Sequence, residues 1–336
     1  MPADATATSP ASGASAMTTG SRRDAATAAL ADVPRSPGAP KPDPILVADR
    51  VVRRFGGLTA VDVEHVEIQR GAITGLIGPN GAGKTTLFNL LTGFDRADTG
   101  SWTFEGTALQ KLPPHRVARR GVVRTFQLTK ALAGMSVLEN MRLGATGQRG
   151  ESFLGALFTG WGAQEKAITG RAHELLRRFQ LDAKAEDLAG SLSGGQRKLL
   201  EMARALMMDP TVVMLDEPMA GVNPALTQTL LGHVRSLRDE GMTVVFVEHD
   251  MDVIRDVSDW VVVMAQGRVI AEGPPEALSS NEAVVDAYLG AHHDQVLEFD
   301  AEGNPVGETA ELVEEMEAAE IVGEERAEPS EEGKRS

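Results

Sequence analysis

The stretch Gly78-Pro79-Asn80-Gly81-Ala82-Gly83-Lys84-Thr85 decides the fold of this 336-residue chain. It fits the pattern G-x-x-x-x-G-K-[ST], which binds phosphate groups when it follows a buried strand and opens a helix. Residues 72–77 are typical of such a strand, and residues 86–91 of the start of such a helix. Glycines let the backbone curl so that successive N–H groups, backed by the positive end of the helix dipole, can cradle phosphate oxygens. The sequence therefore predicts a phosphate-binding loop, or P-loop.

Two side chains at the end of this loop have expected roles of their own. Lys84 can reach the β- and γ-phosphates of a nucleotide, and the Thr85 hydroxyl can ligate Mg²⁺. The expected nucleotide-binding residues here are Gly78, Pro79, Asn80, Gly81, Ala82, Gly83, Lys84, Thr85 and Thr86. The alternative, a glycine-rich turn that binds nothing, does not account for the strand and the helix on either side.

Composition and charge narrow the class of protein. The apolar share of 42% is typical of a globular chain, and no apolar run reaches the roughly 18 residues of a membrane-spanning helix. There is no cysteine, which excludes disulfides and is compatible with a reducing cytosol. The first 40 residues contain no apolar segment of the kind found in secretory signals.

The net charge of −15 lies mainly in the last part of the chain. Residues 291–336 hold 15 acidic and three basic residues, so the remainder is near neutral. A protein that binds nucleic acid usually presents a basic face, and we therefore expect no nucleic-acid partner.

Changes in composition divide the chain into parts. Residues 1–43 are rich in Ala, Ser, Thr, Pro and Gly without periodicity, and are expected to form a disordered extension. Residues 44–290 alternate strand and helix patterns, which predicts an α/β nucleotide-binding domain with a parallel sheet. Strand patterns disappear at about residues 128–190, so a helical subdomain is expected there. The acidic residues 291–336 are expected to be a second disordered tail.

A pair of acidic residues ends a buried strand. The apolar run Val212-Val213-Met214-Leu215 is followed directly by Asp216 and Glu217. Asp216 can hold Mg²⁺ through water, and Glu217 is placed to polarise an attacking water molecule. A strand that ends by chance in solvated acids is the alternative, and the P-loop upstream makes it much less attractive.

The pentapeptide Leu192-Ser193-Gly194-Gly195-Gln196 precedes another predicted helix. Ser193 is a good N-cap residue, and the two glycines leave N–H groups free for an anion. A second phosphate-binding helix start is explained if two chains pair head-to-tail, so that this loop closes on the γ-phosphate bound by the other chain.

The order of these motifs resembles that of an ATP-binding cassette protein over about residues 45–290. The motifs are residues 78–85, Gln127, residues 192–196, Asp216-Glu217 and His249. The resemblance implies a P-loop NTPase core of α/β class, with an antiparallel β subdomain and an inserted helical subdomain. It also implies ATP and Mg²⁺ as cofactors, and two ATP sites that each pair one P-loop with the other chain's LSGGQ signature.

The resemblance extends to individual site residues. Gln127 matches the glutamine that contacts Mg²⁺ and the attacking water, His249 the histidine that contacts the γ-phosphate, and Phe55 the aromatic residue that stacks on adenine. An ordinary core phenylalanine is the alternative for Phe55. At residues 220–223 the chain reads Ala-Gly-Val-Asn where the family usually has Ser-Ala-Leu-Asp, so Asn223 keeps hydrogen bonding but not charge.

The resemblance thus assigns three kinds of site residue. The expected catalytic residues are Glu217, His249, Gln127 and Lys84. The expected metal ligands are Thr85, Gln127 and Asp216. Beyond the P-loop, the expected nucleotide-binding residues are Phe55, Ser193, Gly194, Gly195 and Gln196.

Several stretches look like the ATPase subunits of branched-chain amino-acid importers. They are residues 53–61, 123–127, 157–160, 220–224, 247–251 and 287–290. This implies a peripheral ATPase at the cytoplasmic face of the cell membrane, working with two transmembrane permease subunits and a second cassette, either a related subunit or a second copy. A periplasmic or extracellular solute-binding protein would take part indirectly. Urea import, lipid export and a soluble, non-transport cassette ATPase are the alternatives.

Overall fold

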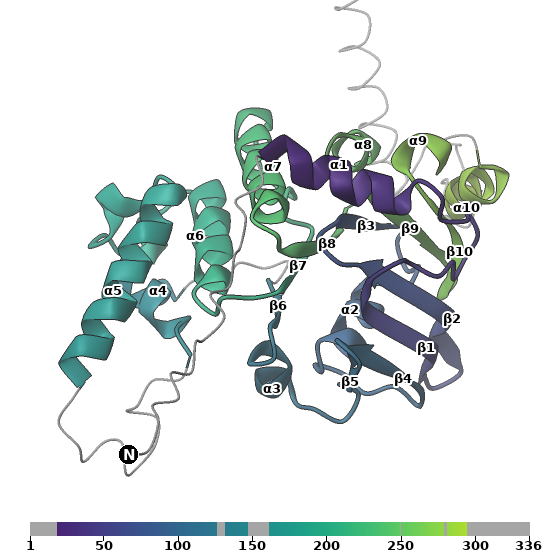
Figure 1. The fold of residues 1–336 in the computed structure, drawn as a ribbon, viewed down its shortest axis with the longest axis horizontal. Helices are drawn as coiled ribbons and strands as arrows, with labels where there is room; N and C mark the ends of the chain where they lie inside the picture. The colour runs from purple at the N-terminus through teal and green to yellow at the C-terminus, as the bar shows by residue number, and fades with distance from the viewer. Residues whose placement is uncertain (1–18, 126–131, 147–160, 249, 279–280, 294–336) are drawn as a thin grey trace, which may run out of the picture. The chain divides into compact units, whose positions relative to one another are not determined.

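The computed structural model describes residues 19–125, 132–146, 161–248, 250–278 and 281–293. The chain divides into two units, residues 1–287 and 288–336, and helix α10 (Glu282–His293) spans the division. The first unit contains two β-sheets with helices around them, which confirms the α/β class (Figure 1).

A six-stranded sheet positions the candidate site, with the strand order β10-β9-β3-β8-β7-β6. The strands are β3 (Ile73–Ile77), β6 (Val122–Arg124), β7 (Val212–Asp216), β8 (Thr243–Val247), β9 (Trp260–Ala265) and β10 (Arg268–Gly273). All neighbours from β9 to β6 are parallel, and β10 alone pairs antiparallel with β9. Strands β3, β7 and β8 are buried at every residue. Burial on both faces explains their unbroken apolar sequences.

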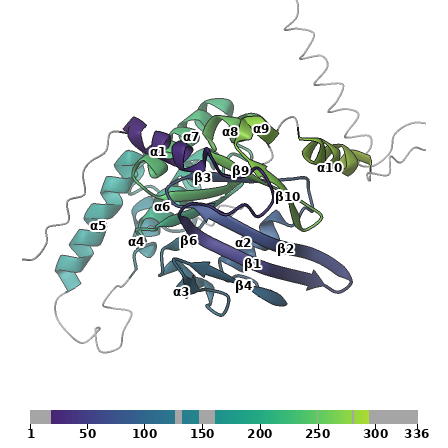
Figure 2. The ribbon, with the colours of Figure 1, turned by 45° about the vertical axis from the view of Figure 1, so that its right-hand side comes forward.

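A four-stranded sheet has the order β2-β1-β4-β5 and is antiparallel throughout, which confirms the expected antiparallel β subdomain. Its strands are β1 (Pro44–Phe55), β2 (Leu58–Gln69), β4 (Thr99–Phe104) and β5 (Thr107–Ala108). Figure 2 shows this sheet with helix α2 (Lys84–Leu91) behind it. Leu87 and Phe88 of α2 line one apolar pocket together with residues of both sheets, such as Leu46 of β1 and Met214 of β7.

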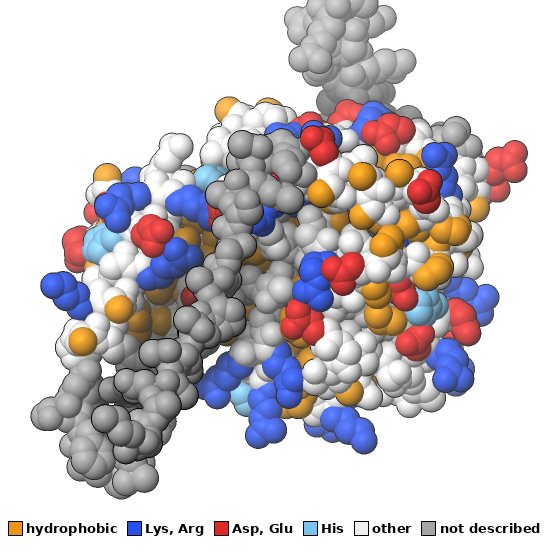
Figure 3. All heavy atoms as spheres, viewed as in Figure 1, with side chains coloured by type: hydrophobic (Ala, Val, Ile, Leu, Met, Phe, Trp, Pro, Cys, Tyr) orange, Lys and Arg blue, Asp and Glu red, His pale blue; other side chains and the backbone are white. Residues whose placement is uncertain are grey.

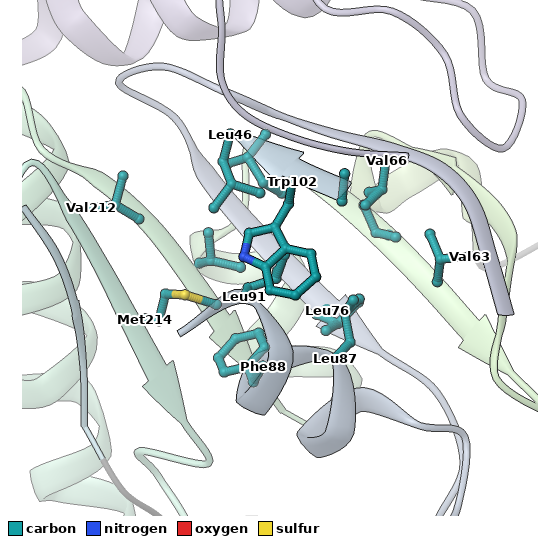
Figure 4. Close-up of a cluster of buried hydrophobic side chains, with 14 of the residues drawn as sticks. Leu46, Val63, Val66, Leu76, Leu87, Phe88, Leu91, Trp102, Val212 and Met214 are labelled. Carbon is teal, nitrogen blue, oxygen red and sulfur yellow. The ribbon is translucent and has the colours of Figure 1, made fainter. Parts of the chain in front are cut away.

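A hydrophobic core fills the space around α2. Trp102 from β4 and Phe88 from α2 are fully buried, and Leu46, Leu87 and Met214 surround them (Figure 4). Each such side chain contributes about 1.5–3 kcal/mol through burial. Because α2 is held by this core, the loop that precedes α2 is held in place as well.

Three helices form a block beside the β6–β7 end of the large sheet (Figure 1). They are α4 (Val137–Leu143), α5 (Trp161–Arg178) and α6 (Gly194–Leu206). On α5 and just after it, Ala172, Leu175, Leu176 and Phe179 are buried at the i, i+3, i+4, i+7 spacing of one helix face. Parts of the predicted helical subdomain, residues 128–131 and 147–160, lie outside the described residues.

The remaining helices cover the sheets or connect strands. They are α3 (Pro114–Ala118), α7 (Pro224–Asp239), α8 (Met251–Val257) and α9 (Pro275–Leu278). No helix in the described part of the chain is long and apolar enough to cross a membrane. The face in Figure 3 carries acidic and basic side chains close together, and ion pairs such as Arg268–Asp62 lie on the surface.

Residues 19–43 correct the sequence analysis, because the prediction of disorder across residues 1–43 is wrong for them. Residues Thr19–Leu30 form helix α1, which contacts α7. Ala26, Leu30 and Val33 are buried. The sequence has little helical periodicity, so this helix depends on tertiary packing that local composition does not reveal.

An ion pair between Lys41 and Glu272 holds the end of this segment on the domain. The two side chains are 1% and 0% exposed, and Lys41 Nζ lies 2.7 Å from the Glu272 carboxylate. Glu272 also accepts hydrogen bonds from the Ala39 N–H at 2.7 Å and the Trp260 indole N–H at 3.0 Å. A buried carboxylate needs such partners, and among them Lys41 supplies the positive charge.

We expect Lys41→Met to lower the free energy of unfolding by about 3–5 kcal/mol, because Glu272 would be left as an unpaired buried charge. Denaturant unfolding of the full chain measures this change. Lys166→Met, at an exposed position on α5, is the matched control and should shift stability by less than about 0.5 kcal/mol. Equal stability of the two variants would show that the segment is not packed as described.

Candidate functional site

The parallel strands bring the predicted functional residues to one edge of the sheet. In the ladder, Val247 of β8 pairs with Leu76 of β3 on one side and with Asp216 of β7 on the other. The P-loop follows β3 directly, and Glu217 follows β7. Since parallel strands end at the same edge, motifs far apart in the sequence become neighbours there.

The P-loop has the curled backbone that its glycines predict. Gly78, Gly81 and Gly83 have φ angles of 146°, 77° and 98°, in the region that favours glycine. A Cβ atom on Gly78 would lie 2.0 Å from the carbonyl oxygen of Met264, and one on Gly83 would lie 2.3 Å from that of Ala60. Both positions therefore require glycine because of space as well as φ.

Lys84 is folded into this loop. Its Nζ donates to the main-chain oxygen of Gly78 at 2.5 Å and to that of Pro79 at 2.9 Å. Burial lowers the pKa of Lys84, while the nearby carboxylates of Glu217 and Asp216 oppose that shift. Both of these hydrogen bonds go to neutral carbonyl groups. The Lys84 ammonium group can exchange them for stronger, charge-assisted hydrogen bonds to phosphate oxygens.

Asp216 is a buried carboxylate whose two oxygens differ. Its side chain is 2% exposed, and Oδ2 accepts a hydrogen bond from the Arg124 guanidinium at 2.5 Å. Oδ1 is buried and has no hydrogen-bond partner among the residues that the structure describes, which is rare for a buried polar atom. Mg²⁺ prefers oxygen ligands and keeps several waters, so the unpaired oxygen of Asp216 and the hydroxyl of Thr85, an exposed residue, have the chemistry to hold a hydrated magnesium ion.

Arg124 is a site residue to which the sequence analysis gave no role. It ends β6, and its guanidinium also donates to the Asn89 side chain at 2.6 Å and lies 5.6 Å from the centre of the Phe88 ring. Arg124 therefore joins helix α2 to Asp216. The signal in the sequence was a charged residue at the end of a buried strand, shortly before Gln127.

Glu217 has a backbone conformation that is uncommon for a residue other than glycine. Its φ angle is 45°. The Glu217 N–H donates to the main-chain oxygen of Val247 at 3.0 Å, and the Glu217 carbonyl accepts a hydrogen bond from Lys198 Nζ at 3.0 Å. The turn after β7 is therefore bonded on both sides, to β8 and to α6.

The signature pentapeptide begins α6 as predicted. Ser193 is the N-cap: its side chain accepts from the Gln196 N–H, and the Gln196 side chain accepts from the Ser193 N–H. A Cβ on Gly195 would lie 1.8 Å from a terminal methyl group of Leu226 on α7, so a larger residue there would have to displace that side chain. Figure 1 shows α6 in the helical block and α2 beside the sheets. Within one chain, no described hydrogen bond or ion pair joins residues 193–196 to residues 78–86.

Four further residues that the sequence analysis singled out have separate outcomes. The Phe55 ring is 48% exposed at the end of β1, with the Arg53 guanidinium 4.4 Å from its centre, so the alternative of an ordinary core phenylalanine is wrong. Asn223 caps α7 by accepting from the Leu226 N–H at 2.9 Å. Gln127 and His249 lie outside the described residues, and their roles stay predictions.

A P-loop at the carboxyl edge of a parallel sheet, beside a buried acidic strand end, defines a P-loop NTPase. A family profile described as "ABC transporter" matches residues 62–220, and one described as "Branched-chain amino acid ATP-binding cassette transporter" matches residues 268–294. The chain belongs to the ATP-binding cassette (ABC) transporter family.

Individual relatives cover most of the chain. It is 41% identical over 252 residues to the probable branched-chain amino acid transport ATP-binding protein LivG of Archaeoglobus fulgidus, covering 75% of this chain and 98% of the relative. It is 40% identical to the high-affinity branched-chain amino acid transport ATP-binding protein BraF of Pseudomonas aeruginosa, covering 74% and 98%. A crystal structure of a nucleotide-free ATP-binding cassette from an ABC transporter matches with a TM-score of 0.65 and 37% identity, covering 73% of this chain and 98% of that one.

We expect Gly78→Ala to weaken nucleotide binding at least about tenfold, because the added methyl group forces the loop away from Met264. Gly81→Ala is the matched control, since a Cβ there would meet no atom within 4 Å and would add only the left-handed backbone cost of about 1–2 kcal/mol. Titration with a fluorescent ATP analogue measures both affinities. Equal losses for the two variants would contradict the packing described for Gly78.

Proposed function

We propose that this chain is the ATP-hydrolysing subunit of an ABC transporter and energises the import of branched-chain amino acids through separate membrane subunits. The observation that carries the proposal is the carboxyl edge of the large sheet, where the P-loop, Asp216 and Glu217 come together. The names of the relatives, with the branched-chain profile at residues 268–294, support the choice of solute.

Nucleotide binding uses the P-loop and its surroundings. The main-chain N–H groups of residues 80–86 bind the phosphates of ATP, and Lys84 exchanges its two carbonyl contacts for β- and γ-phosphate oxygens. The exposed ring of Phe55 stacks on adenine, with Arg53 beside it. Thr85, Gln127 and Asp216 would hold Mg²⁺, which when bound would neutralise charge on the phosphates.

Hydrolysis depends on residues at the ends of β7 and β8. The Glu217 carboxylate orients a water molecule and accepts its proton as the oxygen attacks the γ-phosphorus. The bond from that phosphorus to the bridging oxygen of ADP breaks, giving ADP and inorganic phosphate. Lys84 and His249 stabilise the developing negative charge, and Gln127 contacts the attacking water.

Ser193, Gly194, Gly195 and Gln196 serve the site of a second cassette rather than that of their own chain. Their position in the helical block, apart from α2, supports this assignment. The capped helix start presents N–H groups to the γ-phosphate bound by the other cassette. That second cassette is a related subunit or a second copy of this chain.

Membrane permease subunits are the partners that a transporter cassette requires. We infer that this chain works with two of them and with a second cassette at the cytoplasmic face of the membrane, and that a periplasmic or extracellular solute-binding protein acts through them. Leu143 at the end of α4 is 55% exposed, and Leu132 and Leu188, in the segments that lead into α4 and α6, are 49% and 56% exposed. Such apolar side chains suit a protein partner.

We expect Glu217→Gln to lower ATP hydrolysis by about 100-fold or more, because the amide cannot accept the proton of water. ATP affinity should remain unchanged. The assay uses vesicles that carry the chain with its permease subunits and measures ATP hydrolysis and leucine uptake together. Glu186→Gln, at an exposed position outside the site, is the control and should retain both activities.

Two results would count against the proposal. Undiminished hydrolysis in Glu217→Gln would remove Glu217 from its role. Hydrolysis without uptake of leucine, isoleucine or valine would leave the ATPase assignment intact but reject the solute, and urea uptake and lipid export would then be measured.

A further inference from the structure

Lys198 is a partly buried cation that the proposed mechanism leaves without a role. It lies on α6, five positions after Ser193, and its Nζ donates to the main-chain oxygen of Glu217 at 3.0 Å. Together with Asp216 and Glu217 it lines a small pocket at the end of β7. Partial burial of the ammonium group costs free energy, and the hydrogen bond to the Glu217 carbonyl offsets part of that cost.

The residue that Lys198 holds is conformationally strained. Glu217 has a φ of 45°, and a left-handed backbone costs a non-glycine residue about 1–2 kcal/mol. Such a conformation persists only where the surroundings impose it. The Glu217 N–H is fixed by Val247, and its carbonyl accepts from Lys198 at 3.0 Å and from the Ala220 N–H at 3.2 Å.

The same turn is held at a second point. The carboxylate of Glu248 is buried and accepts a hydrogen bond from the Met219 N–H at 2.9 Å. Burial lowers the pKa of Lys198, and the carboxylates of Glu248, Glu201 and Glu217 oppose that shift. Lys198 thus lies among three carboxylates, with its ammonium group directed by a hydrogen bond to one backbone oxygen.

We infer that Lys198 is a positioning residue for hydrolysis: it holds the backbone of Glu217 in the conformation from which the carboxylate acts on water. This inference rests on the proposed role of Glu217. Backbone conformation sets the direction in which the side chain leaves the strand end, and a displacement of about 1 Å can cost up to about 100-fold in rate.

The position of Lys198 has a consequence for the pair of cassettes. Helix α6 starts at the signature, which serves the ATP site of the other cassette, whereas Glu217 serves the site of its own chain. The bond from Lys198 to Glu217 therefore joins the two sites through one helix. A shift of α6 on nucleotide binding at one site is transmitted to the catalytic glutamate of the other.

Two substitutions separate the hydrogen bond from packing. Lys198→Met keeps an unbranched side chain of similar length but removes the charge and the hydrogen-bond donor. Lys198→Arg keeps a cationic donor. In the transporter assembled with its permeases, we expect Lys198→Met to lower kcat for ATP about tenfold or more, with KM for ATP within about twofold. Lys198→Arg should recover a substantial part of kcat, and Lys166→Met on exposed α5 should match the unmodified protein.

A double-mutant comparison tests whether Lys198 acts through Glu217. Single-turnover hydrolysis of radiolabelled ATP is measured for Glu217→Gln with and without Lys198→Met. We expect no further loss, because residues that act as a unit are not additive. A similar loss in both backgrounds, a rise in KM instead of a fall in kcat, or unchanged kcat in Lys198→Met would overturn the inference.

These outcomes distinguish the inference from the proposed function. If Glu217→Gln hydrolyses ATP normally, the role of Glu217 fails and the inference fails with it. If Glu217→Gln is inactive while Lys198→Met retains its kcat, the inference about Lys198 alone fails.

Discussion

Val247 pairs with Leu76 on one side and with Asp216 on the other, and the rest of the site depends on this alignment of three parallel strands. This alignment places the P-loop and the acidic turn after β7 next to each other at the same edge of the sheet. All three strands are buried on both faces, so the alignment cannot slip without exposing the core. Charges at this edge lie in a poorly solvated environment, where Arg124 beside Asp216 and Lys198 beside Glu217 have stronger effects than they would in water.

The sequence predicted the structure correctly wherever the cause of a local conformation lies within the same short stretch of residues. Gly78 and Gly83 need glycine for local space, the acidic pair follows an unbroken apolar strand, and Ser193 caps the helix that it precedes. The prediction failed for Lys41, because its partner Glu272 is 231 residues away and no local pattern links them. Arg124 and Lys198 were missed for the same reason: their roles exist only once strands and helices are assembled.

The separation of α2 from α6 supports the proposed dependence of the site on a second cassette. In one chain, the P-loop lies beside the two sheets and the signature lies at the start of a helix in another block (Figure 1). The same helix reaches the turn of Glu217 through Lys198. In the proposed function, each chain binds one nucleotide through its P-loop and completes the site of another through α6.

Site-specific disulfide cross-linking tests this claim most directly, since the chain contains no cysteine that would interfere. One cysteine replaces Asn80 in the P-loop and another replaces Ser193, in the Glu217→Gln background. If the second cassette is a related subunit, its own signature serine carries the second cysteine. The account predicts a disulfide between two chains that forms with ATP and Mg²⁺ and not without them. A disulfide within one chain, or no dependence on ATP, would contradict it.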